Sequence, residues 1–145
     1  MEVYIAARFS RIQEAQFLAA FLEEQCGHNV ISRWMKPGSD HRMPDGTPSE
    51  QAEDSERERF ATEDLEDLYQ AEWLISLMEK PRGNGRGGRH VEFGYALGMN
   101  VKTVRVFDRI KMTIIGPRET VFHHLPEVQH FNTISLFKES MRVEQ

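Results

Sequence analysis

The hydrophobic positions of this chain fall into short apolar runs and into longer stretches in which apolar residues recur every three or four positions. The short runs at Val3–Ala7, Asn29–Arg33 and Glu72–Met78 have the length and composition of β-strands. Within the last of them, Trp73–Leu77 is a near-continuous apolar run, which is typical of a central strand buried on both faces of a parallel sheet.

The longer stretches predict helices. From Arg11 to Cys26 the apolar residues share one helix face, with Ser10 at the N-cap position and Gly27 at the C-cap position. Further helices are expected over about Glu53–Gln70, from Gly88 or Arg89 to Met99 with Val91, Tyr95, Ala96 and Met99 on the packing face, and from Ile134 onward.

Other segments are less regular. Lys36–Gln51 is rich in proline, glycine and polar residues, and its length indicates a functional loop such as a lid. Both Lys102–Phe107 and Met112–Ile115 read as strands, and the pattern does not decide which one belongs to the core sheet. A short helical or turn element near Glu119–Leu125 and a brief strand near His130–Asn132 precede the last helix.

Strands that alternate with helices predict an α/β fold with a mostly parallel sheet and right-handed crossovers. A chain of 145 residues fits one domain, covering residues 1–145. Because such sheets bind ligands at the carboxyl ends of their strands, the loops after Ala7, Arg33 and Met78 are expected to converge on one crevice.

The charge, the cysteine count and the lengths of the apolar runs indicate which partners and which compartment to expect. The net charge is −5 with both signs interspersed, so there is no basic field to attract a nucleic-acid polymer. The single cysteine, Cys26, leaves no internal disulfide and fits a reducing compartment. No apolar run approaches the roughly 20 residues that span a bilayer, so we expect no membrane partner and a cytoplasmic location.

Glu92 stands out because it comes after the glycine-rich segment 83–88, early in a predicted helix. Glycines let a ligand approach the backbone closely, and the positive end of the helix dipole is expected to keep the carboxylate ionised at neutral pH. The alternative is that Glu92 only stabilises the start of its helix, a common role for glutamate.

Three blocks of this sequence resemble the nucleoside 2-deoxyribosyltransferase family, whose superfamily includes nucleoside 5'-monophosphate N-glycosidases. They are Tyr-Ile-Ala-Ala at 4–7, Asp-Leu-Glu-Asp-Leu-Tyr-Gln-Ala-Glu-Trp-Leu-Ile at 64–75 and Gly-Gly-Arg-His-Val-Glu-Phe-Gly-Tyr-Ala at 87–96. The segment 115–126 is similar to the segment after the fourth strand in phage and bacterial members.

The resemblance implies a flavodoxin-like three-layer sandwich with a mostly parallel central sheet of about five strands. It also implies an enzyme that cleaves or transfers at the N-glycosidic bond of a (deoxy)nucleoside or nucleoside 5'-monophosphate. No metal or organic cofactor is expected, because the nucleophile is a side chain. The family forms homodimers and higher homo-oligomers, and the region of His123 and His124 is expected to reach a neighbouring subunit.

Carried over by position, Glu92 matches the family's catalytic glutamate, which attacks the anomeric carbon and forms a covalent glycosyl-enzyme. Asp64 matches an aspartate that holds the sugar or the nucleophile, or manages the proton on the departing base. Tyr4 matches a tyrosine whose hydroxyl reaches the glutamate or the sugar. The alternatives are an exposed helix carboxylate for Asp64 and a core aromatic for Tyr4.

The chain departs from the family where an aspartate often helps to recognise the base, because Arg86-Gly-Gly-Arg stands there. Guanidinium groups suit a phosphate, and Arg8, Ser10 and Arg11 in the first loop repeat that theme. The alternative is that these arginines pair with nearby acids.

The remaining predicted substrate contacts are Ala6, Trp34, Gly88 and His90. Trp34 offers a ring for base stacking or simply packs in the core, and His90 is otherwise an exposed helix residue. Adjacent histidines such as His123 and His124 chelate a metal poorly, so no metal site is expected. A second function class stays open, a nucleotide-binding module of the same fold without the reaction, and within the enzyme class both hydrolase and transferase remain open.

Overall fold

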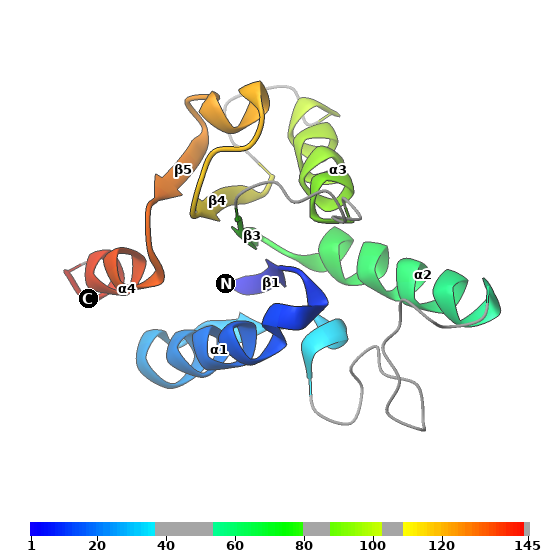
Figure 1. Cartoon of the computed structure of the whole chain (residues 1–145), viewed down its shortest axis with the longest axis horizontal. Coiled ribbons are helices and arrows are strands. Elements are labelled where there is room, and N and C mark those ends of the chain that lie inside the picture. The colour runs from blue at the N-terminus through cyan, green and yellow to red at the C-terminus, as the bar shows by residue number, and fades with distance from the viewer. Residues whose placement is uncertain (37–53, 80–87, 103–108, 144–145) are drawn as a thin grey trace.

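A five-stranded parallel sheet forms the centre of the computed structural model, which describes residues 1–36, 54–79, 88–102 and 109–143 (Figure 1). The strand order is β2-β1-β3-β4-β5. This is the flavodoxin-like doubly wound order, so the predicted α/β fold class is confirmed. The strands are β1 (Glu2–Ala6), β2 (Asn29–Val30), β3 (Trp73–Leu77), β4 (Lys111–Ile115) and β5 (Val128–Phe131).

Helices cover both faces of the sheet. α1 and α4 lie on one face, and α2 and α3 lie side by side on the other (Figure 1). The helices are α1 (Ile12–Cys26), α2 (Asp54–Gln70), α3 (Gly88–Lys102) and α4 (Ile134–Val143), with short 3-10 turns η1 (Phe9–Arg11), η2 (Arg33–Met35) and η4 (Val121–His124).

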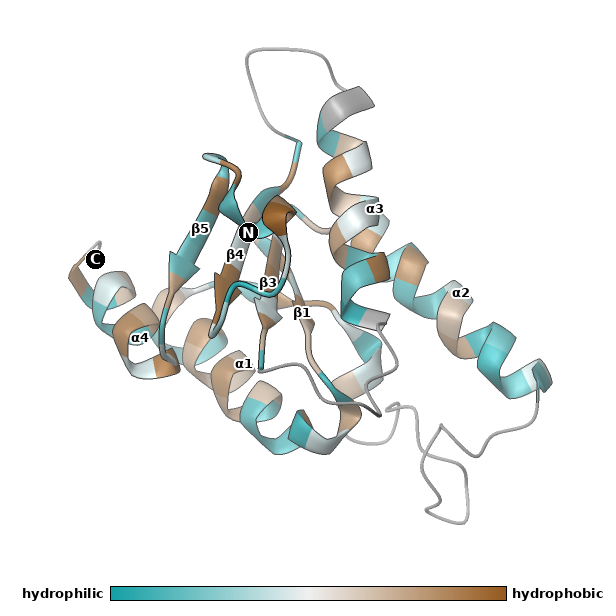
Figure 2. Ribbon diagram, turned by 45° about the horizontal axis from the view of Figure 1, so that its top comes forward, coloured by the Kyte–Doolittle hydropathy of each residue, from teal (hydrophilic) through white to brown (hydrophobic). Residues whose placement is uncertain are grey.

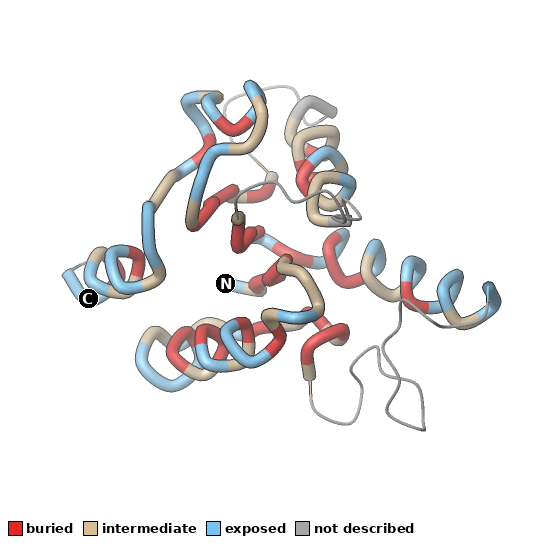
Figure 3. The backbone as a smooth tube through the Cα atoms, viewed as in Figure 1, coloured by how far each residue is buried: buried red, intermediate tan, exposed pale blue. Residues whose placement is uncertain are grey.

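The core sits on β1, β3 and β4, whose residues are almost all buried (Figure 3). β3 is buried at every position, as its apolar run predicts for a strand covered on both faces. In α1 the apolar residues Ala15, Leu18, Ala19 and Leu22 are buried. The hydropathy colouring shows that α2 is mostly hydrophilic toward its N-terminal end (Figure 2). Within the described residues, no helix is long and apolar enough to cross a bilayer.

Several local predictions need correction. Only Asn29 and Val30 pair in β2, because the chain turns into η2 at Arg33 instead of continuing the strand. Ser10 lies inside η1, and the residue at the N-cap of α1 is Arg11, whose side chain makes no capping hydrogen bond. Gly27 does close α1 in the left-handed conformation, with φ 73°.

The packing face of α3 also differs from the prediction. Val91 is exposed, whereas Phe93, Ala96 and Met99 are buried against the sheet. Steps of three residues lead from Met99 through Ala96 to Phe93, so Val91 falls outside the buried face although it precedes Tyr95 by one helical turn.

The fourth strand is now identified. Lys111–Ile115 forms β4, and Lys102 is the last residue of α3 rather than the start of a strand. Residues 103–108 lie outside the described residues, as do residues 37–53 with most of the predicted lid. The last strand is Val128–Phe131, slightly earlier than expected.

Candidate functional site

Tyr4, Asp64 and Glu92 meet on the face of the sheet that α2 and α3 cover. Tyr4 lies in the middle of β1 and is fully buried. The negative charges of Glu92 and Asp64 both act on its hydroxyl and, together with burial as the largest cause, raise its pKa well above the usual value. Three side chains that are far apart in sequence therefore share one buried cluster, and Tyr4 stays protonated within it.

The carboxyl group of Glu92 is buried although its residue lies on a partly exposed turn of α3. Burial raises its pKa to about 7, and hydrogen bonding from Tyr4 works in the opposite direction. The expectation of a fully ionised carboxylate is therefore wrong. Glu92 is in the second turn of α3, where the dipole has weakened, and removal of water dominates.

Asp64 is part of the same buried cluster and not an exposed helix carboxylate. Burial is the main cause that raises its pKa to about 8, and the charges of Glu92, Asp67 and Glu63 raise it further, against the opposing charge of Arg33. Two interacting carboxyls with raised pKa values titrate as a pair. Near neutral pH the pair holds close to one proton, and Asp64 carries it more often than Glu92 does.

The cluster also contains buried polar atoms without full hydrogen bonds. Tyr4 Oη and Glu92 Oε2 are buried, and neither makes a well-formed hydrogen bond to the described residues. Tyr4 is nevertheless near enough to lower the pKa of Glu92. Leaving a buried polar group unsatisfied costs about 1–3 kcal/mol, so such atoms are expected where a ligand completes the bonding.

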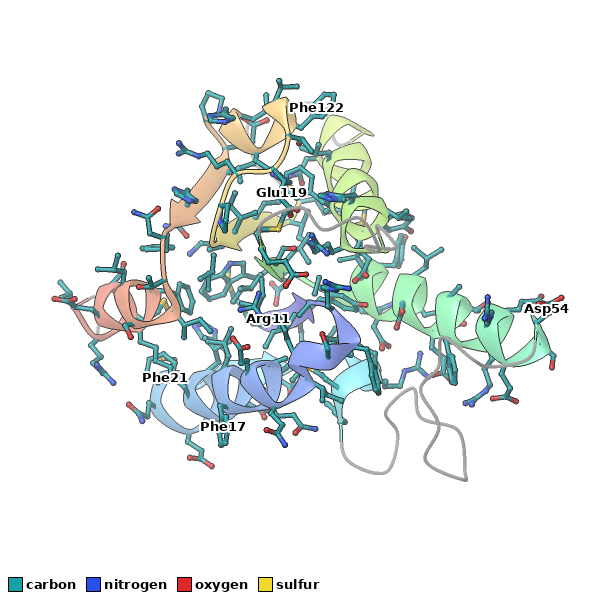
Figure 4. All side chains as sticks on the ribbon, viewed as in Figure 1. Arg11, Phe17, Phe21, Asp54, Glu119 and Phe122 are labelled. Carbon is teal, nitrogen blue, oxygen red and sulfur yellow. The ribbon has the colours of Figure 1, made fainter. Side chains whose placement is uncertain are left out.

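The loops after β1 and β3 are joined by the arginines of the first loop. Arg8 Nη1 lies 2.8 Å from Glu79 Oε1. Arg11 donates to the carbonyl oxygen of Met78 at 3.1 Å and pairs with Glu14 at 2.7 Å, and Figure 4 shows its side chain directed toward the middle of the molecule. Arg8 and Arg11, which the sequence predicts as ligands of an anion, therefore bond to carboxylates and a backbone carbonyl of the protein itself. This is the alternative that the sequence left open.

Trp34 contributes packing and not a stacking surface. It lies in η2, is 5% exposed, and donates from Nε1 to the carbonyl oxygen of Ile5 at 2.6 Å. Phe9 packs near it, with ring centroids 6.4 Å apart. Ala6 ends β1 and is buried next to the cluster, whereas Ser10 is exposed on η1.

The start of α3 is fixed by a buried ion pair. Arg89 donates two hydrogen bonds from Nη2 to Glu119, at 2.8 and 3.0 Å, and both side chains are less than a tenth exposed. Glu119 lies on the inner side of the β4–β5 connection, toward α3 (Figure 4). The guanidinium of Arg89 is therefore occupied by its ion pair with Glu119. Arg86 lies outside the described residues, and Gly88 is the first residue of α3.

The histidines of this region pack together. His90 stacks on His123 with ring centroids 5.9 Å apart, and His123 accepts hydrogen bonds at Nδ1 from the backbone of Glu119 and Thr120. Burial is the largest cause that lowers the pKa of His123, so the ring is neutral and supports the η4 turn. No three metal-binding side chains come together among the described residues.

Two residues of the cluster were not predicted from the sequence. Asp67 is 8% exposed and accepts hydrogen bonds from both the backbone and the side chain of Arg33. A groove of about 610 Å³ runs along the outside of α2 beside this pair, but Tyr4, Asp64 and Glu92 do not line it. We therefore place the site at the buried cluster. The available signal was Asp67 one helical turn after Asp64, hidden among the many acids of α2.

Comparison with protein-family models, with curated proteins and with solved structures gives no match to this chain.

Proposed function

We propose that this protein cleaves or transfers the N-glycosidic bond of a nucleoside or nucleoside 5'-monophosphate through a covalent glycosyl intermediate on Glu92. The observation that carries the proposal is the meeting of Tyr4, Asp64 and Glu92, where the buried Glu92 Oε2 has no well-formed hydrogen bond to any residue that the structure describes. These are the three positions that match the catalytic residues of the nucleoside 2-deoxyribosyltransferase family.

In the first step the ionised carboxylate of Glu92 attacks the anomeric carbon of the sugar. The carbon–nitrogen bond breaks, its electron pair leaves with the base, and Asp64 supplies the proton that the base requires. The raised pKa values of the two carboxyls suit these two roles. Near neutral pH Asp64 can hold the proton that the leaving base needs, while Glu92 is ionised and free to attack.

In the second step water or an acceptor base attacks the same carbon. The bond between sugar and Glu92 breaks, its electrons return to the carboxylate, and the proton lost by the attacking group returns to Asp64. Tyr4 stays protonated because its pKa is raised, so its hydroxyl remains a donor to Glu92 or the sugar through both steps. No metal or cofactor is needed for either step.

The substrate class rests on the resemblance together with the first loop. Arg8 and Arg11 lie between the ends of β1 and β3, where a 5'-phosphate could exchange with the carboxylates that now hold them. We extend the proposal to a homodimer or higher homo-oligomer, which the family resemblance implies.

The test compares wild-type protein with Glu92→Gln on a panel of nucleosides and 5'-monophosphates, with and without a free acceptor base, and measures base release by chromatography. Glu58→Gln is the matched control, because Glu58 is an exposed carboxylate on α2. We expect the E92Q variant to lose at least about a hundredfold in turnover, since a neutral amide is a poor nucleophile. Undiminished turnover in folded E92Q contradicts the proposal.

The same panel separates the alternatives within the proposal. Capture of the sugar by the added base identifies a transferase, and its release to water identifies a hydrolase. Binding of a nucleotide in calorimetry without any base release would instead establish a binding module that has the fold and lacks the reaction.

A further inference from the structure

Next to Tyr4, the backbone of β1 is hydrogen-bonded by side chains where the neighbouring strand β2 has ended. Ile31 donates to the carbonyl oxygen of Val3 at 2.9 Å, so Ile5, two residues along β1, turns its backbone groups to the same side. β2 has already ended there. Ser32 Oγ accepts from the Ile5 amide at 3.3 Å, and Trp34 Nε1 donates to its carbonyl oxygen.

Arg33 lies between Ser32 and Trp34 in the sequence, but its amide and its side chain bond to α2. Its amide donates to Asp67 Oδ2 at 2.9 Å, and its Nε donates to Asp67 Oδ1 at 2.9 Å. Its Nη2 lies 3.0 Å from Glu66 Oε2. Three consecutive residues, Ser32 to Trp34, therefore bind β1 next to Tyr4 and α2 one turn from Asp64.

We propose that Arg33 is a positioning residue, which holds Asp67 and thereby fixes the turn of α2 that places Asp64 against Tyr4 and Glu92. Asp64 and Asp67 are three residues apart on α2, so they lie on neighbouring turns of the same helix face. The kinetic part of this inference rests on the proposed function, whereas the structural part concerns the cluster itself.

The charges around Asp64 give this arrangement a measurable signature. Glu92 faces it from α3, Tyr4 from β1, Asp67 and Glu63 from its own helix, and Arg33 from η2. Arg33 lowers the pKa of Asp64 and Asp67 raises it. If Arg33 acted only through its charge, a lysine in its place would leave the pKa of Asp64 unchanged. If Arg33 positions Asp64, losing the Nε hydrogen bond to Asp67 moves Asp64 out of the buried cluster and lowers its pKa, because burial is the largest cause that raises it.

The experiment monitors the side-chain carboxyl carbon of Asp64 by NMR across pH, with Asp64→Asn to assign its signal. We expect the Asp64 midpoint to fall in Arg33→Lys, which keeps the charge but loses the Nε hydrogen bond to Asp67, and to fall in Asp67→Asn, because a displaced Asp64 is less buried. Arg59→Gln is the matched control, since Arg59 is an exposed arginine of α2 paired with Glu56 and Glu63. An Asp64 midpoint in R33K that matches the wild-type value overturns the proposal, because Arg33 then acts through its charge alone.

A second measurement uses base release, where the wild-type protein shows it. We expect R33Q to lower kcat about tenfold with KM within about twofold, because misplacing Asp64 affects the transition state more than substrate binding. R59Q should leave both constants unchanged, and an R33Q enzyme with wild-type kcat overturns the proposal. Absence of base release in the wild-type protein would count against the proposed function alone, because the titration needs no substrate.

Discussion

Tyr4 and Glu92 face each other from β1 and α3, and each has a buried polar atom without a well-formed hydrogen bond to the described residues. Their coupling is nevertheless felt in the pKa of Glu92, which hydrogen bonding from Tyr4 lowers against the larger effect of burial. This relationship joins the sheet to the helix that carries the proposed nucleophile.

Replacing Tyr4 with Phe should raise the pKa of Glu92, because the variant removes the hydroxyl that favours the ionised carboxylate. We expect base release at neutral pH to fall at least about tenfold. The free energy of unfolding should change by less than about 1 kcal/mol, since the lost hydroxyl makes no well-formed hydrogen bond within the described part of the chain. NMR titration of Glu92 and urea unfolding check both parts. Tyr69→Phe, at an exposed tyrosine, should alter neither quantity.

The contribution of Glu92 and Asp64 to the stability of the protein should fall as pH rises from about 4 to about 8. The folded-state pKa values of Glu92 and Asp64, about 7 and about 8, lie above the ordinary values of 4.5 and 3.8. Between those limits the folded protein binds more protons than the unfolded chain, so its advantage is complete at low pH and is lost as these groups ionise. Each contributes a slope of at most about 1.4 kcal/mol per pH unit.

Urea unfolding across this range measures that slope. The double variant Asp64→Asn with Glu92→Gln should flatten it, because neither amide titrates. A variant whose pH dependence matches the wild-type protein would show that the two carboxyls are not held with raised pKa values.

The rate of base release should show a bell-shaped pH profile. Ionised Glu92 is needed for attack and protonated Asp64 for departure of the base, so kcat/KM should be greatest between about pH 7 and about pH 8. In Asp64→Asn the alkaline limb should disappear while the acid limb remains. An alkaline limb that persists unchanged in D64N would remove Asp64 from the role of acid.

Breaking the ion pair between Arg89 and Glu119 should destabilise the fold strongly. Both side chains are less than a tenth exposed, so removing one leaves the other charge buried without its partner. We expect Glu119→Gln to lower the free energy of unfolding by about 3–5 kcal/mol. Glu14→Gln, at the half-exposed partner of Arg11, should change it by less than about 1 kcal/mol. Urea denaturation of both variants checks the contrast.

Much of the fold is encoded in local patterns of the sequence. Trp73–Leu77 forms the fully buried strand that its apolar run predicts, and Gly27 ends α1 in the left-handed conformation expected of a C-cap glycine. The errors lie where tertiary contacts override the local pattern. Ser32 and Trp34 satisfy the backbone of Ile5, so the chain does not extend β2 as its composition suggested.

The site could also be predicted in part. The three sequence blocks pointed to Tyr4, Asp64 and Glu92, and the fold brings these side chains together. Their protonation could not be predicted, because it depends on how completely α2 and α3 exclude water from the cluster. The roles of Arg33 and Asp67 depend on a contact between residues 34 positions apart, which no local pattern encodes.

The most direct test of the central claim is mass spectrometry of the protein quenched during turnover of a nucleoside or nucleotide whose base it releases. We predict an added mass equal to the sugar or sugar phosphate, on the peptide that contains Glu92, and its absence in Glu92→Gln. Base release by E92Q at the wild-type rate, with no adduct on that peptide in the wild-type protein, would contradict a covalent intermediate on Glu92.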